Sequence, residues 1–328
     1  MLNKYRFFPF STQIRQVFLT VVLNVSFLIQ PVAARTFSEI YSFGDSLVDT
    51  GNTFELTGLP TEPYFEGRLS NGLLWNEYLA QELEIPLTNL GFAGATSSEL
   101  GLFLFGGEAI SPVPGMLTQV SNFLDTSNSS IDSNALYTIW VGANDYLFAE
   151  IEDPSIPVNN ITTAVTNLTQ AGAENFLLVN LPDLGELPLI DLLGIPEEDV
   201  DALNLLSDVH NLGLEQSVQS LNSSGQINVD LLDINSLFRQ ALNGELGFEN
   251  TTDACTLTPE CLLNQTIQDT FLFWDEVHPT TTAYSLIADT AAAELMPVPE
   301  PMTIYGSFLT LGFCAALKHQ KKLGKHRE

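Results

Sequence analysis

The order of the predicted elements indicates an α/β fold in which helices cover both faces of a parallel β-sheet. Short apolar or β-branched runs alternate along the chain with segments whose apolar residues recur at helical spacing. The hydrophobic content of 45% is ample for a packed core. The length of 328 residues fits one large domain or two small ones, and no internal repeat is evident.

The pattern predicts five strands and five main helices. The strands are expected over residues 39–43, 88–92, 135–141, 175–181 and 227–234. The helices are expected over residues 71–83, 116–124, 158–171, 197–221 and 284–295.

The first 34 residues are predicted to be a secretory signal peptide. Lys4, Arg6 and Arg15 form a basic start, a mostly apolar run follows over residues 17–29, and residues 32–34 are small enough for cleavage. The alternative is an uncleaved membrane anchor. It is disfavoured because the apolar run is shorter than the ~20 residues that a spanning helix needs. The mature body is therefore expected to begin at residue 35.

The C-terminal residues 297–328 contain Pro-Glu-Pro at 299–301, a mostly apolar stretch over 302–317, and a basic end. A helix over that stretch can reach most of the way across a bilayer, and its basic end should stay cytoplasmic. This order resembles the PEP-CTERM sorting signal. The resemblance implies a Gram-negative bacterium, processing by an exosortase-type enzyme, transient anchoring in the inner membrane, and release to the cell surface or extracellular matrix. A permanent single-helix anchor is the alternative.

The charge of the body is strongly negative. Only three of the 11 Lys and Arg residues lie between positions 35 and 301, against 39 of the 40 Asp and Glu residues, which leaves a net charge of −36. Affinity for nucleic acid rests mainly on Lys and Arg that neutralise phosphates. The composition therefore excludes nucleic acid as a partner, and the acidic excess is interpreted as a means of solubility.

The three cysteines suggest no metal site. Cys255 and Cys261 are spaced closely enough for a disulfide in an exported protein, although their spacing alone does not establish one. Neither has the further Cys or His partners that zinc would need. Cys314 lies in the apolar C-terminal stretch.

The motif Gly44-Asp45-Ser46-Leu47 follows the first predicted strand. Ser46 is therefore expected at the carboxyl edge of the sheet, where open α/β sheets bind their ligands. It could be a nucleophile, or it could cap a helix that begins near Asp49. The Gly-x-Ser-x-Gly elbow of α/β-hydrolases is not present around it.

A serine nucleophile needs a neighbouring base, which is usually histidine. The body contains two histidines, His210 and His278. His210 lies inside a long helical pattern and is interpreted as structural. His278 follows Asp275 by three residues, so that one turn can hold both side chains, and Asp275 can then orient the ring and stabilise its charged form.

Two glycine-containing segments after predicted strands could bind an anion. Gly94 follows the second strand and can bring its backbone N–H close to a substrate because it has no Cβ. Asn144 follows the third strand and can donate from its side chain, with the backbone N–H of Ser46 as a third donor. Each segment taken alone is only a turn.

Taken together, Gly-Asp-Ser-Leu at 44–47, Gly94, Gly-Ala-Asn-Asp at 142–145, and Asp275 with His278 resemble the GDSL, or SGNH, hydrolase family over about residues 38–296. The resemblance assigns a hydrolase domain to residues 35–296. It implies a flavodoxin-like three-layer α/β/α sandwich with five parallel strands and neither metal nor organic cofactor. It also implies that Ser46, Asp275 and His278 form a catalytic triad, with Ser46, Gly94 and Asn144 as the oxyanion hole.

The expected activity is that of a carboxylic ester hydrolase, and its substrate is left open. Residues 101–107 are expected to form an apolar loop, which could be an acyl-chain site or lid or could simply be packed inside. A lipase or short-chain carboxylesterase is the first interpretation, and a polysaccharide O-deacetylase is the second. Acyl transfer to an alcohol and a non-catalytic surface or matrix protein are the remaining alternatives.

Overall fold

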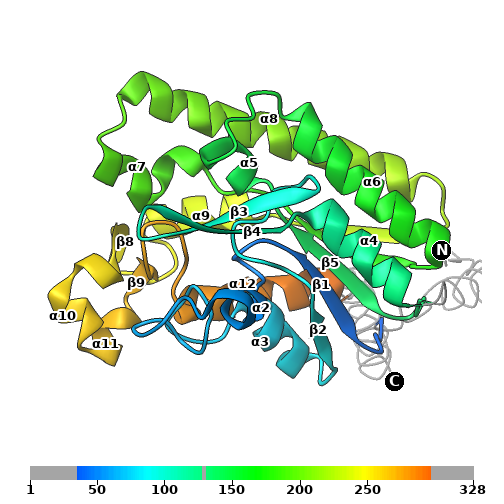
Figure 1. Ribbon diagram of the computed structural model, residues 1–328, viewed down its shortest axis with the longest axis horizontal. Coiled ribbons are helices and arrows are strands. Elements are labelled where there is room, and N and C mark those ends of the chain that lie inside the picture. The colour runs from blue at the N-terminus through cyan, green and yellow to red at the C-terminus, as the bar shows by residue number, and fades with distance from the viewer. Residues whose placement is uncertain (1–34, 128–130, 297–328) are drawn as a thin grey trace, which may run out of the picture. The chain divides into compact units, whose positions relative to one another are not determined.

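The computed structural model describes residues 35–127 and 131–296. Their centre is a five-stranded sheet in the order β2-β1-β5-β6-β7, in which every pair of neighbours is parallel (Figure 1). The strands are β1 (Ile40–Gly44), β2 (Leu87–Asn89), β5 (Leu136–Trp140), β6 (Asn175–Val179) and β7 (Asn228–Leu232). Each overlaps one predicted strand, so the prediction of a five-stranded parallel sheet is confirmed.

Helices cover both faces of this sheet. α3 (Trp75–Glu82) packs with α12 (Thr281–Leu295) on one face, and α4 (Met116–Thr126), α6 (Ser155–Ala171) and α8 (Glu197–Asn222) pack in a row on the other (Figure 1). The three-layer arrangement is thus also confirmed. The shorter helices are α2 (Asn52–Thr57), α5 (Ala143–Leu147), η1 (Leu184–Glu186), α7 (Pro188–Leu193), α9 (Ile234–Leu242), η2 (Cys255–Leu257), α10 (Pro259–Leu262) and α11 (Gln265–Gln268).

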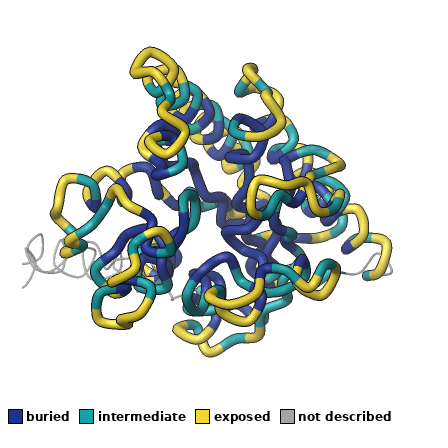
Figure 2. The backbone as a smooth tube through the Cα atoms, turned by 60° about the vertical axis from the view of Figure 1, so that its left-hand side comes forward, coloured by how far each residue is buried: buried dark blue, intermediate teal, exposed yellow. Residues whose placement is uncertain are grey.

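The strands alternate their side chains between two hydrophobic cores, because successive residues of a strand point to opposite faces. In β6, Phe176 and Leu178 pack in the core beneath α4, α6 and α8, whereas Leu177 and Val179 pack in the core beneath α3 and α12. The backbone of the sheet is accordingly the buried centre of Figure 2, with exposed loops around it. This burial on both faces explains why the central strands β5 and β6 are mostly apolar in the sequence.

The predicted helix over residues 71–83 begins later than expected, at Trp75. Asn71 is held outside the helix because its side chain accepts from the backbone N–H of Thr281 at 2.8 Å and donates to Gln268 at 3.1 Å. Both partners lie about two hundred residues away. Long-range hydrogen bonds of this kind leave no local signal in the sequence.

The predicted loop over residues 101–107 is instead part of an antiparallel hairpin. Strand β3 (Leu100–Phe105) pairs with β4 (Glu108–Pro114), and Gly106 and Gly107 form the turn with positive φ angles. The expectation of a loop was therefore wrong. Prolines at 112 and 114 obscured the second strand, since proline is confined to strand edges and bulges.

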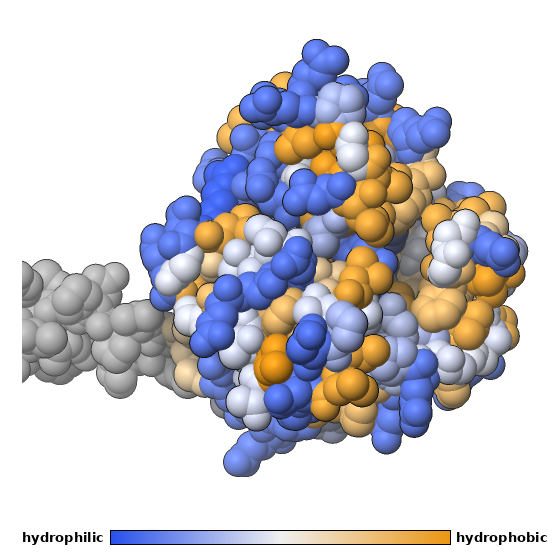
Figure 3. Space-filling model, turned by 90° about the vertical axis from the view of Figure 1, so that its left-hand side faces the viewer, coloured by the Kyte–Doolittle hydropathy of each residue, from blue (hydrophilic) through white to orange (hydrophobic). Residues whose placement is uncertain are grey.

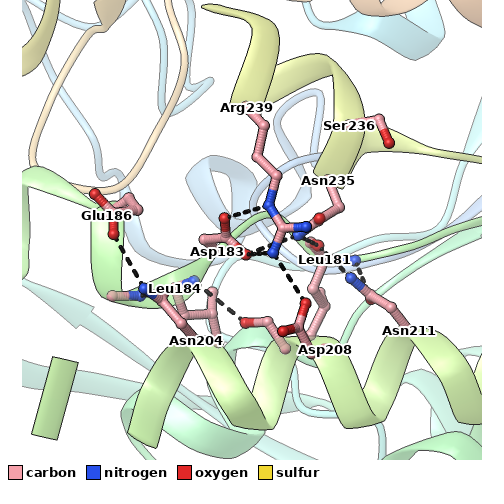
Figure 4. Close-up of polar contacts among 12 residues, drawn as sticks. Leu181, Asp183, Leu184, Glu186, Asn204, Asp208, Asn211, Asn235, Ser236 and Arg239 are labelled. Atoms are coloured by element: carbon pink, nitrogen blue, oxygen red, sulfur yellow. Dashed lines mark hydrogen bonds and ion pairs between the residues drawn. The ribbon is translucent and has the colours of Figure 1, made fainter. Parts of the chain in front are cut away.

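The segment that follows β6 is held by a polar network around Arg239 of α9 (Figure 4). The guanidinium donates to both carboxylate oxygens of Asp183, at 2.7 and 2.8 Å, and to Asp208 at 2.9 Å. The amide of Asn235 donates to Asp183 and to the backbone carbonyl of Leu181. The network joins this segment to α8 and α9, and it thereby anchors the chain immediately before α7.

Beyond the main sheet, a small parallel pair is formed by β8 (Asn250–Ala254) and β9 (Phe271–Phe273). Cys255 and Cys261 form a disulfide in the connection between these strands, and both cysteines are fully buried. Trp274 and Phe271 pack in the same cluster. The disulfide that the cysteine spacing left open is therefore present.

None of the helices within residues 35–127 and 131–296 combines the length and apolar character needed to cross a membrane. The predicted signal peptide at 1–34 and the predicted PEP-CTERM signal at 297–328 lie outside the described residues.

The end of β1 is held by one buried side chain of α4. The amide oxygen of Gln119 accepts from the backbone N–H of Gly44 at 2.9 Å, and its nitrogen donates to the Gly44 carbonyl at 2.8 Å. Gly44 has a φ of +146°, and a Cβ there would lie 1.9 Å from the carbonyl oxygen of Trp140. Only glycine fits this position, and Gln119 satisfies its backbone groups two residues before Ser46.

We expect Gln119→Ala to lower the free energy of unfolding by about 2 kcal/mol, because it leaves the buried N–H of Gly44 without its acceptor. Urea unfolding monitored by circular dichroism would measure this change. Gln81→Ala, on the exposed side of α3, is the matched control and should change stability by less than about 0.5 kcal/mol. Equal stability of the two variants would contradict a stabilising role for the hydrogen bonds between Gln119 and Gly44.

Candidate active site

Three connections meet at the carboxyl edge of the sheet. Ser46 follows β1, Asn144 lies in α5 directly after β5, and His278 lies in the turn between β9 and α12. The parallel register pairs Gly44 with Trp140, so the segments that leave β1 and β5 start side by side. The structure thus brings Ser46 and His278 together across 232 positions of the chain.

Ser46, His278 and Asp275 form a continuous chain of hydrogen bonds. The hydroxyl oxygen of Ser46 lies 2.8 Å from Nε2 of His278. Nδ1 of His278 lies 2.8 Å from each carboxylate oxygen of Asp275. Ser46 and Asp275 are 7% and 4% exposed, so the chain is shielded from water while one side still faces a cavity.

Asp275 is held by the turn that carries His278. Its Oδ1 accepts the backbone N–H groups of Val277 at 2.9 Å and His278 at 2.7 Å. The carbonyl of His278 in turn accepts from the backbone N–H of Trp274 at 2.7 Å. The three-residue spacing noted in the sequence therefore closes a compact turn.

The electrostatics of the site favour an ion pair between Asp275 and a protonated ring. Burial alone would lower the pKa of His278, but the adjacent Asp275, with smaller contributions from Asp45 and Glu276, raises it above its ordinary value. Burial alone would raise the pKa of Asp275, but His278 and the two backbone N–H groups hold it below its ordinary value. Burial raises the pKa of the nearby Asp45 to about 7.

Gly94 and Asn144 line the same cavity as Ser46. Gly94 has a φ of +82°, and a Cβ there would lie 2.4 Å from the carbonyl oxygen of Leu102 in β3. The side-chain nitrogen of Asn144 donates to the carbonyl of Ala95 at 2.9 Å. An amide nitrogen carries two hydrogens, so this bond leaves one that a substrate can use.

A buried network behind this wall was missed in the sequence. Asp145 accepts both the backbone N–H of Ser97 at 2.8 Å and its hydroxyl at 2.6 Å. The same hydroxyl accepts from Asn160 of α6 at 2.9 Å. The network fixes the loop that carries Gly94 against α5. The Gly-x-Asn-Asp motif could have indicated a partner for Asp145, but nothing local identified Ser97.

The cavity has a volume of about 440 Å³, and its lining is mostly apolar. The hairpin β3–β4, α7 and the His278 turn surround it. Figure 3 shows this side of the molecule, with hydrophobic side chains gathered around a hollowed surface. The apolar lining residues are Leu69, Leu102, Phe103, Leu104, Phe105, Phe148, Leu189, Leu192 and Val277.

Tyr64 is a second residue that the sequence did not indicate. It lines the cavity, and its hydroxyl lies 3.1 Å from Oδ2 of Asp275. No pattern around position 64 points to Asp275, which lies 211 positions further along the chain.

His210 lies in α8, as the helical pattern suggested, and is not among the residues that line the cavity. Its ring packs against Gly142, at the start of the segment that carries Asn144. It is fully buried, and its Nδ1 is 2.9 Å from the hydroxyl of Tyr146. Burial lowers its pKa to about 4, so the ring is neutral at neutral pH. Within the described part of the chain, no three His, Cys, Asp or Glu side chains are grouped so that they could hold a metal ion.

Comparison with known proteins identifies the family. A family model described as GDSL-like Lipase/Acylhydrolase matches residues 40–291. A thermolabile hemolysin of Vibrio parahaemolyticus is 28% identical over 273 residues, covering 77% of this chain and 62% of the hemolysin. A phosphatidylcholine-sterol acyltransferase of Aeromonas hydrophila is 27% identical over 328 residues, covering 84% of this chain and 95% of that protein.

Among solved structures, a member of the lipolytic protein G-D-S-L family from Veillonella parvula superimposes with a TM-score of 0.44 and 17% identity. It covers 78% of this chain and 97% of its own. Since the family model spans most of the sequence, from the first strand of the sheet to the last helix, the chain belongs to the GDSL-like lipase/acylhydrolase family and is an ester-bond hydrolase.

Proposed function

We propose that the protein hydrolyses carboxylic esters through an acyl-enzyme on Ser46. The observation that carries the proposal is the hydrogen-bonded chain from Ser46 through His278 to Asp275 at one wall of a largely apolar cavity. A neutral His278 can take the proton of the serine hydroxyl, and Asp275 orients the ring and stabilises its charged form. The cavity gives an ester access to the hydroxyl.

In the first half of the reaction, the Ser46 oxygen bonds to the ester carbonyl carbon while its proton moves to Nε2 of His278. The carbonyl electron pair moves onto oxygen and forms a tetrahedral oxyanion. When this intermediate collapses, the bond to the alcohol oxygen breaks and the alcohol takes the proton from Nε2. In the second half, water gives a proton to Nε2 and attacks the acyl-enzyme. The acid is released and Ser46 regains its proton.

The oxyanion requires hydrogen-bond donors within reach of the carbonyl oxygen that Ser46 attacks. We assign this role to the backbone N–H groups of Ser46 and Gly94 and to the side chain of Asn144. Two features support the assignment: Gly94 lines the same cavity as Ser46, and Asn144 keeps a free hydrogen after its bond to Ala95. Donors that are already in place stabilise the transition state without reorganisation.

The apolar lining favours an ester with a hydrophobic acyl chain. Leu102, Leu104 and Phe105 of β3 and Leu189 and Leu192 of α7 line the cavity. Charged substrates gain little from such walls, whereas each buried methylene contributes about 0.8 kcal/mol. The names of the hemolysin and of the phosphatidylcholine-sterol acyltransferase relatives fit a lipid substrate. Polysaccharide O-deacetylation and acyl transfer to an alcohol are the competing outcomes.

We also propose that the protein is exported and sorted through its ends. The buried Cys255–Cys261 disulfide supports an oxidising compartment, because such bonds rarely persist in the cytosol.

N-terminal sequencing of the protein recovered from a Gram-negative host should show a start near residue 35, and deletion of residues 297–328 should abolish exosortase-dependent processing. An intact N-terminus and unchanged processing would contradict the proposal.

Ser46→Ala and His278→Ala are expected to abolish hydrolysis of p-nitrophenyl esters, because each removes one member of the proton-transfer chain. Asn144→Ala should lower kcat by about 10²- to 10³-fold with little change in KM, the usual effect of losing one oxyanion donor. The wild type should prefer acyl chains longer than acetyl. Steady-state kinetics with esters of increasing chain length, with acetylated polysaccharide and with added alcohol would measure these effects and separate the competing substrates.

Circular dichroism should show that all three variants are folded, and Asn122→Ala on the exposed side of α4 is the control for Asn144. Full activity in Ser46→Ala would overturn the mechanism. A change in KM alone would make Asn144 a substrate-binding residue and not an oxyanion donor.

Activity should fall on the acid side of the pH profile. His278 must be neutral to accept the proton, and Asp275 raises its pKa, so kcat/KM should decline as the pH falls through a value above the ordinary ~6.5. Asp275→Asn removes the carboxylate, so the limb should move to lower pH and the rate should drop. Salt should shift the wild-type limb only slightly, since Asp275 is in direct contact. A limb unaffected by Asp275→Asn would show that His278 is not the base.

A further inference from the structure

The hydroxyl of Tyr64 contacts the buried carboxylate of Asp275 from a distant part of the chain. It lies 3.1 Å from Oδ2 across 211 positions. An ionised carboxylate only accepts hydrogen bonds, so the tyrosine is the donor. Burial and the Asp275 charge raise the pKa of Tyr64 far above its ordinary value. The hydroxyl therefore remains protonated throughout the working range of an esterase.

The hydrogen-bond donors to Asp275 come from two parts of the chain: its own turn and the segment that carries Tyr64. Oδ1 receives the backbone N–H groups of Val277 and His278, which belong to the same turn as the aspartate. The ring of His278, whose Nδ1 lies 2.8 Å from each oxygen, belongs to that turn as well. Donors within the turn do not by themselves fix the carboxylate relative to segments outside it. The bond from Tyr64 to Oδ2 starts from a separate segment, between α2 and α3. It ties the plane of the carboxylate to the rest of the fold.

The ring of Tyr64 is itself held on two sides. It makes an edge contact with Phe105 of β3 at a centroid distance of 5.7 Å, and another with Trp274 at 6.3 Å. Its backbone N–H donates to the carbonyl of Thr61 at 3.1 Å. Edge-to-face contacts of this kind orient rings specifically. Tyr64 therefore presents its hydroxyl to Asp275 from a preorganised position.

Building on the proposed hydrolytic mechanism, we propose that Tyr64 is a positioning residue, whose hydroxyl keeps Asp275 aligned with Nδ1 of His278. The donor has a second effect, because it draws on the negative charge of the carboxylate. It thereby limits how strongly Asp275 favours the protonated ring. With Tyr64 in place, His278 can accept the serine proton at a lower pH than it otherwise could.

The groups that face this pair are few. Glu276, on the same turn, and Asp45, after β1, both favour the protonated form of His278. Buried Tyr284 of α12 lies within the field of Asp275 and Asp45. A substitution at Tyr64 leaves all of these in place, so a shift of the pH profile reports the Tyr64 hydroxyl alone.

Tyr64→Phe keeps the ring and removes only the hydroxyl. We expect kcat to fall by at least about tenfold, as for a lost hydrogen bond to a charged group, while KM changes less than about twofold. The acid limb of kcat/KM should move to higher pH. Tyr137→Phe, which removes a hydroxyl that donates to the Asp132 carbonyl at 2.8 Å, is the matched control and should show neither change.

Replacement of Tyr64 by 3-fluorotyrosine provides a measurement that does not depend on how Tyr64→Phe folds. Fluorination makes the hydroxyl a stronger donor with nearly the same shape, so the acid limb should move to lower pH. A purely structural role for the ring predicts no shift in either variant. Unshifted profiles for both, or an effect on KM alone, would overturn the proposal.

A double-variant cycle separates this inference from the mechanism on which it rests. If Tyr64 acts through Asp275, then Tyr64→Phe combined with Asp275→Asn should be no slower than Asp275→Asn alone. Additive losses would mean that Tyr64 acts elsewhere and would overturn the inference. Full activity in Asp275→Asn would instead refute the proposed triad, whatever the effect of Tyr64→Phe.

Discussion

The close approach of Gly44 to the carbonyl of Trp140 is the constraint on which the rest of the site depends. A Cβ at position 44 would lie 1.9 Å from that carbonyl oxygen, and the Gln119 amide satisfies both backbone groups of the glycine. The chain can then turn sharply out of β1 next to the end of β5. Because the two strands are parallel, the segments that carry Ser46 and Asn144 leave the sheet at the same edge.

Burial gives the charges at this edge their effect. Asp275 stays ionised in a nearly water-free position because backbone N–H groups, the His278 ring and Tyr64 all meet its two oxygens. Asp45 is equally buried, and its carboxylate accepts the backbone N–H of Leu47 at 3.0 Å. Burial has the larger effect there and raises the pKa of Asp45 to about 7. Two carboxylates of the same site therefore have pKa values shifted in opposite directions by their surroundings.

Positive charge is scarce in this acidic body, and two of its three arginines are used to hold the architecture. Arg68 forms a paired contact with Glu77 at 2.8 and 2.7 Å, which joins the segment before α3 to that helix. Arg239 joins Asp183, in the segment before α7, to Asp208 of α8 (Figure 4). Two parallel bonds from one guanidinium give a fixed geometry that a lysine could not. Both pairs support segments that border the cavity.

The sequence by itself determined the sheet and its two helical layers, because short apolar or β-branched runs that alternate with segments of helical spacing are local patterns. It also indicated Ser46, Asp275 and His278, since a motif after a strand and a three-residue spacing are local features. Only the tertiary structure decided the hairpin at residues 100–114, the late start of α3 and the contact of Tyr64 with Asp275. These depend on partners that meet only after the chain has folded, and no short-range periodicity encodes such pairs.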